Sequence, residues 1–222
     1  MDFDFAPVVH GWRALMHGAL VTVEVSFGAI ALGCLVGLVI GLGRLDPRRR
    51  GIYALCSAYL TVVRGTPLLV QLFIWFFGLP VFGVQLPAFF CGIVGIGMYS
   101  GAYVSEIVRG AIQSIDRGQM EAARSLGMPY RMAMRDIVIP QAVIRMIPPL
   151  GNEFIAVIKN SSLVSLLTIA DVMHEGQKII SVSYRSLEVY LAIALVYFAL
   201  TNLTGFALRL AERRLAVGGL VQ

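Results

Sequence analysis

The sequence predicts an all-α integral membrane protein with five transmembrane helices. Of its 222 residues, 58% are hydrophobic and 14% are charged, whereas about 25% of the residues of a soluble domain are charged. The mean hydropathy is +0.79, and most arginines gather in short polar intervals between long apolar stretches. A chain of this size cannot bury so much apolar surface in a water-facing fold. We therefore expect a single transmembrane domain over residues 1–222.

The first expected span covers residues 18–43 and contains glycines four residues apart. Gly33, Gly37 and Gly41 share one helix face, which lets another helix approach closely. The polar segment that follows, residues 44–50, contains four arginines. Cytoplasmic loops carry an excess of basic residues, so we place this loop inside the cell and the N-terminus outside.

The other expected spans fit the same orientation; they cover residues 52–79, 88–108, 137–158 and 190–208. The predicted outer loop at residues 80–87 carries no charge, and a mixed-charge segment at residues 170–188 is also placed outside. Five arginines fall between the third and fourth spans, and three follow the fifth span. Both groups are expected inside, which puts the C-terminus in the cytoplasm.

The longest polar interval, residues 119–140, reads as two short helices joined at a break. Asp116 is a predicted N-cap, and Gln119 has the spacing to return a side-chain bond as in a capping box. Gly127 suits the left-handed position after a helix end, and Pro129 suits the first turn of the next helix. We expect a helix over about residues 117–127 that lies across the membrane surface.

The second span contains a charge and a helix breaker close together. A charged residue at the bilayer centre costs about 3 kcal/mol on insertion scales, so Arg64 needs a reason to be there. Pro67 removes a backbone donor and predicts a break, which is tolerated only where protein or water lines it. Arg64 at such a break can bind a carboxylate through two hydrogen bonds. The alternative is a structural ion pair of Arg64 with Glu106 or Glu153.

The fourth span is also expected to be interrupted, by Pro148, Pro149 and Gly151. Glu153 and Asn160 follow; they are seven residues apart and share one helix face, while Asn152 and Ser161 are nine residues apart and share it less well. A polar stripe on an otherwise apolar helix indicates a lined cavity. The alternative is that these side chains form hydrogen bonds between helices.

Two sets of motifs resemble the permease subunits of ATP-binding-cassette (ABC) importers. Glu121-Ala122-Ala123, Gly127 and the sequence Ile137-Val138-Ile139-Pro140 have the spacing of the EAA loop of that family, with Ile139 where leucine is usual. Arg-Gly-Thr-Pro, Gly-Asn-Glu-Phe and Lys-Asn-Ser-Ser-Leu resemble the polar amino-acid branch, which includes the histidine and glutamine systems. The resemblance covers about residues 15–215. Asn160 stands where that branch often has aspartate, so the identity of the substrate is not inferred from the resemblance.

The resemblance implies a type I ABC importer permease of the bacterial inner membrane that pairs with itself or with a homologous permease. Two copies of an ATPase subunit would dock on the EAA loop, and an external binding protein would deliver substrate. ATP and Mg²⁺ would be bound by the ATPase, because no phosphate-binding GxxxxGK[ST] loop occurs in this chain. The ATPase-coupling residues would be Glu121, Ala122, Ala123, Leu126 and Gly127.

The predicted function is therefore transport of polar amino acids or close derivatives, without a cofactor, metal site or enzymatic activity in this chain. The candidate substrate-binding residues are Arg64, Thr66, Glu153, Asn160 and Ser161. The alternative is an ion-coupled secondary transporter that uses Glu24, Glu106 and Glu153. A membrane protease is disfavoured because no histidine lies within an expected span. Nucleic acid is not expected as a partner, since membrane topology accounts for the positions of the basic residues.

Overall fold

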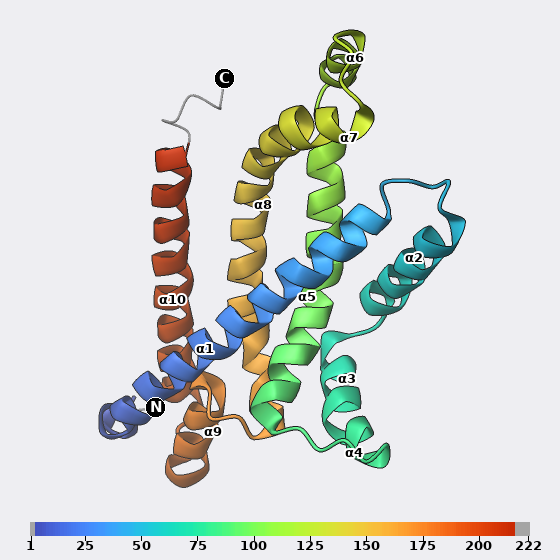
Figure 1. Cartoon of the computed structure of the whole chain (residues 1–222). Coiled ribbons are helices and arrows are strands. Elements are labelled where there is room, and N and C mark those ends of the chain that lie inside the picture. The colour runs from blue at the N-terminus through green and yellow to red at the C-terminus, as the bar shows by residue number, and fades with distance from the viewer. Residues whose placement is uncertain (1–2, 216–222) are drawn as a thin grey trace.

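A computed structural model describes residues 3–215, and all regular structure in this range is helical (Figure 1). The elements in chain order are α1 (Ala6–Gly43), α2 (Arg50–Gly65), α3 (Leu68–Phe73), the π-helix η1 (Ile74–Gly78), α4 (Leu79–Val81), α5 (Ala88–Gln113), α6 (Arg117–Ser125), α7 (Tyr130–Ala133), the π-helix η2 (Met134–Val138), α8 (Ile139–Asn160), the 3₁₀-helix η3 (Ser161–Leu167), α9 (Val172–Ser183) and α10 (Ser186–Leu215). The first helix thus begins at Ala6, earlier than the expected first span.

Three helices, α1, α5 and α10, are long and apolar enough to cross a membrane. Two bent pairs bring the number of candidate spans to five. One pair is Arg50–Gly65 with Leu68–Val81, bent by 107°, and the other is Tyr130–Leu167 with Val172–Ser183, bent by 50°. Large apolar side chains such as Phe27 and Leu195 are each 68% exposed. This pattern suits helices that face lipid and confirms the predicted fold class.

The predicted glycine stripe lies where α1 crosses α5 (Figure 1). A Cβ atom added to Gly33 would lie 3.1 Å from the Ser100 hydroxyl, and one added to Gly41 would lie 2.9 Å from the Ser105 carbonyl oxygen. A Cβ atom added to Gly37 would collide with the Val104 side chain. The absence of side chains at these positions is therefore what lets α1 and α5 approach each other closely.

The predicted break in the second span is confirmed. Helix α2 ends at Gly65, Thr66 is extended, and α3 begins at Leu68 directly after Pro67. Pro67 has no backbone N–H with which to continue the helix. The chain therefore turns at this point instead of running straight across.

The predicted interruption of the fourth span is wrong. Helix α8 runs without a break from Ile139 to Asn160, with Pro148 and Pro149 inside it. A proline removes one hydrogen bond and favours a kink, but membrane helices tolerate it where neighbouring helices and local adjustment compensate. Here α8 packs against α5 and α10, and a Cβ atom added to Gly151 would lie 3.1 Å from Leu208. Packing on both sides thus outweighs the local sequence signal.

A buried apolar cluster holds α3, α5 and α8 around α1. Its members include five fully buried residues: Val25, Leu72, Ile96, Val157 and Leu167. Because these residues come from five different elements, the cluster fixes α5 between the broken helix and α8. This arrangement positions the polar groups described next.

Candidate functional site

Helix α6 projects beyond the bundle at one end of the molecule (Figure 1). Its first turn is capped by Asp116, whose Oδ1 accepts a hydrogen bond of 2.6 Å from the backbone N–H of Gly118. The backbone N–H of Gln119 donates to the Asp116 carbonyl at 3.1 Å. The predicted N-cap is therefore confirmed, although the capping-box bond from the Gln119 side chain is not formed within the described residues.

The far end of α6 closes in a Schellman motif. Gly127 has φ +86°, as predicted, and its N–H donates to the Arg124 carbonyl at 3.0 Å. The next N–H, of Met128, donates to the Ala123 carbonyl at 3.1 Å. These two bonds satisfy carbonyls that a helix end otherwise leaves without partners. Pro129 then precedes α7, so the turn between the two helices is fully specified by local residues.

The exposed surface of the capped helix carries both polar and apolar side chains. Ala123 is buried, whereas Glu121, Ala122 and Gly127 are exposed, and Leu126 is 84% exposed. A leucine left so open at the end of a rigidly capped helix is suited to insertion into a groove on another protein. The five predicted coupling residues thus lie together on α6 and in the turn that ends it.

Arg64 lies at the end of α2 beside a polar cavity of about 460 Å³. The lining residues are Arg44, Ser57, Leu60, Thr61, Arg64, Gly65, Tyr103 and Glu106. The Arg64 guanidinium carbon lies 5.5 Å from the centroid of the Tyr103 ring, which is a cation–π contact. Within the described residues, Arg64 forms an ion pair with neither Glu106 nor Glu153. The alternative prediction, a structural ion pair of Arg64 with one of these glutamates, is therefore wrong.

Glu153 lies on α8 and is bound to α5. Its Oε1 accepts a hydrogen bond of 2.8 Å from the Ser100 hydroxyl. One residue before Ser100, the Tyr99 hydroxyl lies 3.0 Å from that of Tyr103, whose ring contacts Arg64. Helix α5 therefore carries a row of hydroxyl groups between the two predicted charged residues, which sequence spacing alone did not indicate.

The other predicted binding residues differ in exposure: Thr66 is exposed, Asn160 is half-buried and Ser161 is buried. Thr66 donates to the Val62 carbonyl at 2.8 Å and accepts a bond of 2.8 Å from Gln71. Gln71 also donates to the Val63 carbonyl at 2.8 Å, so it braces the break. Ser161 is fully buried and donates to the Ile158 carbonyl at 2.8 Å, while Asn160 is half-buried at the end of α8. Thr66 and Ser161 therefore hold backbone in place.

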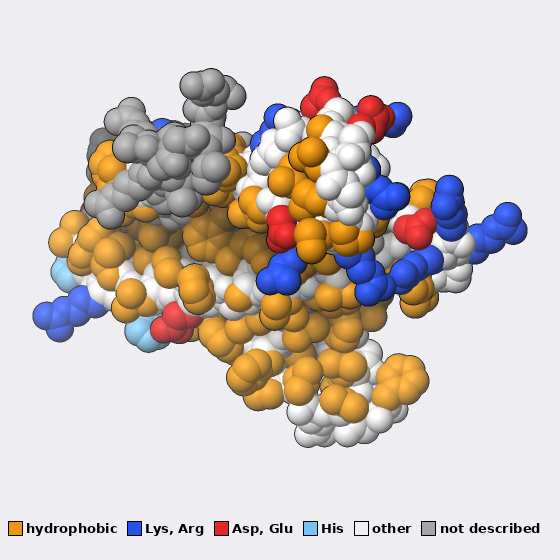
Figure 2. Space-filling view, turned by 45° about the horizontal axis from the view of Figure 1, so that its top comes forward, with side chains coloured by type: hydrophobic (Ala, Val, Ile, Leu, Met, Phe, Trp, Pro, Cys, Tyr) orange, Lys and Arg blue, Asp and Glu red, His pale blue; other side chains and the backbone are white. Residues whose placement is uncertain are grey.

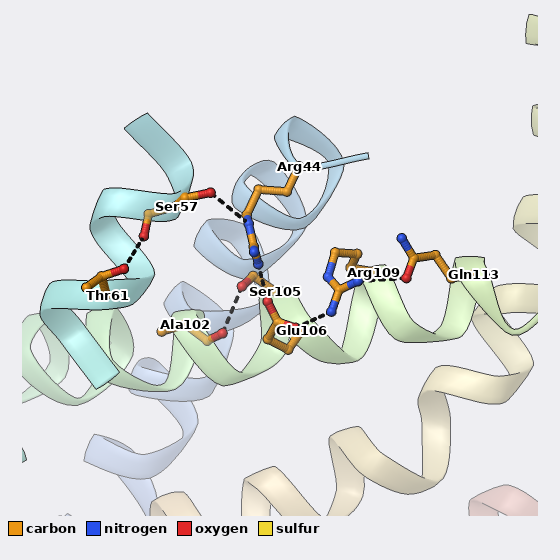
Figure 3. A network of polar contacts seen from close by, with 8 residues as sticks. All are labelled: Arg44, Ser57, Thr61, Ala102, Ser105, Glu106, Arg109 and Gln113. Atoms are coloured by element: carbon orange, nitrogen blue, oxygen red, sulfur yellow. Dashed lines mark hydrogen bonds and ion pairs between the residues drawn. The ribbon is translucent and has the colours of Figure 1, made fainter. Parts of the chain in front are cut away.

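Glu106, which lines the same cavity as Arg64, belongs to a network of ion pairs and hydrogen bonds (Figure 3). It pairs with Arg44 from the end of α1 and with Arg109, whose Nη2 lies 2.5 Å from Glu106 Oε2. Arg44 also donates to Ser57 Oγ at 3.3 Å, and Arg109 donates to Gln113 at 2.7 Å. The network ties α1, α2 and α5 together. The Glu106–Arg109 spacing of three residues is visible in the sequence, but the approach of Arg44 is not.

Comparison with known proteins defines the class. Residues 29–217 match the family described as binding-protein-dependent transport system inner membrane component, and the chain belongs to that family. It is 34% identical over 216 residues to the arginine transport system permease protein ArtQ of Bacillus subtilis (strain 168), covering 97% of this chain and 98% of that protein. It is 35% identical over 219 residues to the glutamine transport system permease protein GlnP of Escherichia coli (strain K12), covering 98% and 100%.

Solved structures agree with this assignment. A crystal structure of an amino acid ABC transporter with histidines has a TM-score of 0.90 and 43% identity, and the match covers 96% of this chain and 100% of that one. The MetNI methionine ABC transporter in an inward-facing conformation has a TM-score of 0.77 at 19% identity, covering 91% and 96%. At that identity the second likeness supports the fold alone, and it is the fold of an ABC importer permease.

Proposed function

We propose that this chain is the permease subunit of an ABC importer for polar amino acids or close derivatives. Membership of the family and the similarity to permeases named for arginine and glutamine support this function. The observation that carries it is the arrangement along α5, where a cation from α2 and a carboxylate from α8 flank a row of hydroxyl groups. Neither charged group is neutralised by the other.

This arrangement suits a zwitterion. Arg64 offers paired N–H donors to an α-carboxylate, and Glu153 offers a carboxylate to an ammonium or a polar side chain. Asn160 supplies a hydrogen-bonding group without charge, and Thr66 and Ser161 hold the backbone that carries the site. Tyr99, Tyr103 and Ser100 add hydroxyl groups to the lining.

The proposed mechanism places ATP hydrolysis in another subunit. Two ATPase copies, which bind ATP and Mg²⁺, dock on α6 of this chain and of its partner permease, which is a second copy or a homologue. An external binding protein delivers substrate, and the complex resides in the bacterial inner membrane with the N-terminus outside and α6 in the cytoplasm. The ATPase shifts the permease between outward-open and inward-open states because it binds them with different affinity.

Reconstitution tests this proposal directly. The permease is co-purified with a candidate ATPase and binding protein, inserted into proteoliposomes, and supplied with radiolabelled amino acids. ATP-dependent uptake that survives collapse of ion gradients by ionophores is the expected result. Uptake that needs an ion gradient and no ATP would instead establish the ion-coupled secondary transporter, and failure of the chain to bind any ATPase would reject the coupling role of α6.

A further inference from the structure

A second cavity, distinct from the one beside Arg64, opens between the end of α1 and α7. It has a volume of about 560 Å³ and is formed by the α1–α2 loop and by side chains of α2, α7 and η2. The lining residues are Leu42, Gly43, Leu45, Asp46, Arg48, Arg49, Ile52, Tyr130 and Met134. We call this cavity the loop groove.

The floor of the loop groove is apolar and open. Leu42 is 44% exposed, Ile52 is 49% exposed and Tyr130 is 54% exposed. Exposed apolar side chains that line one concave surface mark a binding site. The groove adjoins the C-terminal end of α1, a helix apolar enough to cross a membrane, and the proposed topology puts this end on the cytoplasmic side.

The rim of the loop groove is cationic. Arg48 forms no ion pair within the described residues, and Arg49 is paired only with Asp46, at 3.8 Å, where both side chains are more than half exposed. An ion pair this open contributes little, so Asp46 offsets the arginines only in part. Figure 2, which views the end of the molecule that carries α6, shows Lys and Arg side chains gathered on one side of this face.

We propose that the loop groove binds an anionic phospholipid, with the phosphate at Arg48 and Arg49 and an acyl chain along Leu42 and Ile52. Basic side chains at the cytoplasmic end of a span attract anionic headgroups. A free phosphate would leave the apolar floor uncovered, and a zwitterionic lipid would leave the arginines without a net counter-charge. Only a ligand that joins both chemistries matches both parts of the groove.

The loop groove is separated from α6 by one wall and a neighbouring cavity. Leu45, Tyr130 and Met134 form a wall shared with a neighbouring cavity of about 520 Å³, which is bounded on its other side by Arg117 and Met120 of α6. A lipid seated in the loop groove therefore restrains the wall on which α6 rests. This consequence rests on the proposed coupling role of α6, whereas the lipid site itself does not.

Native mass spectrometry of the full-length permease in detergent tests the site. The probes are phosphatidylglycerol, phosphatidylcholine with identical acyl chains, and inorganic phosphate. The variant is Arg48→Gln with Arg49→Gln, and the control is Arg13→Gln with Arg209→Gln, which removes the same charge elsewhere. Since each arginine near an anionic surface adds about fivefold to binding, the variant should bind phosphatidylglycerol about 30-fold more weakly, and the control should not.

Each other outcome overturns the proposal. Equal loss in the control would mean general charge attraction, and equal binding of phosphatidylcholine would mean an apolar groove without headgroup selection. Displacement by inorganic phosphate at equal concentration would mean a free-anion site. Loss of phosphatidylglycerol on adding the ATPase would mean that the ATPase covers the groove. The binding measurement needs no transport, so it separates failure of this proposal from failure of the proposed function.

Discussion

The guanidinium of Arg64 lies over the ring of Tyr103, with 5.5 Å between the guanidinium carbon and the ring centroid. An arginine held by a ring, and not by a carboxylate, keeps its N–H donors available. This contact holds the guanidinium at the break between α2 and α3 and leaves it open to a ligand anion. Replacing Tyr103 by leucine should raise the substrate concentration for half-maximal uptake about two- to fivefold, because an exposed cation–π contact is worth about 0.5–1 kcal/mol.

Tyr103→Phe serves as the matched variant for this prediction, since it keeps the ring and loses only the hydroxyl bond to Tyr99. Uptake into proteoliposomes measures both. Identical half-saturation for the leucine variant and the unmodified protein would show that the ring does not position Arg64.

The two charged residues of the proposed substrate site can be removed together. Arg64→Met with Glu153→Gln should assemble with the ATPase yet lower uptake about tenfold or more, because a hydrogen bond to a charged group is worth about 1.5–3 kcal/mol. Since the two side chains form no ion pair, each single variant should also assemble. Arg13→Met with Glu24→Gln removes the same charges from the exposed part of α1 and should transport normally. Near-normal uptake in a well-assembled Arg64/Glu153 double variant would refute the site.

The turn after α6 gives a second test. Gly127→Val should weaken ATPase co-purification, since a left-handed conformation costs a residue with a Cβ atom about 1–2 kcal/mol and valine suits it least. A Cβ atom at Gly127 would meet nothing within 4 Å, so the effect comes from backbone strain alone. Gly127→Asn should retain more binding, because asparagine tolerates this conformation. Unchanged coupling in both Gly127→Val and Glu121→Lys would reject the docking assignment.

Membrane orientation is measurable by cysteine labelling in intact cells, in a background lacking Cys34, Cys56 and Cys91. Phe82→Cys and Tyr184→Cys, at positions 84% and 86% exposed, should react with a membrane-impermeant reagent. Leu126→Cys, at a position 84% exposed, should react only after the cells are opened. Labelling of Leu126→Cys from outside would invert the proposed topology.

The α1–α5 contact predicts opposite effects for two glycine-to-alanine changes. Gly37→Ala drives a methyl group into Val104, and such overpacking costs about 1–3 kcal/mol. Gly110→Ala has nothing within 4 Å and should stabilise helix α5 by up to about 1 kcal/mol. Thermal unfolding in detergent compares them. A Gly37→Ala protein as stable as the unmodified one would mean that the two helices separate easily.

The sequence correctly predicted those features that depend only on neighbouring residues. Pro67 ends a helix because its ring removes a donor, and Gly127 closes one because it accepts a positive φ; both need no knowledge of the rest of the chain. The glycine stripe likewise requires only helical periodicity. Each of these features is present in the structure.

Features set by distant residues were missed. Helix α8 continues through Pro148 and Pro149 because α5 and α10 pack against it. Glu106 pairs with Arg44, 62 positions away, and not with Arg64. Ser161 is a polar residue of the type that lines binding sites, but tertiary packing buries it completely, which the sequence does not show. The row of hydroxyl groups on α5 was overlooked because tyrosine and serine in an apolar helix carry no charge that marks them.

The close fit of glycines along α1 has a mechanical consequence. Two helices whose backbones touch over several turns cannot slide past each other without collision, so α1 and α5 move as one rigid body. Any rocking motion of the protein must then bend the chain at segments outside the α1–α5 contact. The bend at Thr66 and Pro67 joins α2 to α3, and the turn at Gly127 joins α6 to α7. Both lie outside the α1–α5 contact, so the glycine stripe does not itself hold the segments that they join, one beside the cavity at Arg64 and the other after α6.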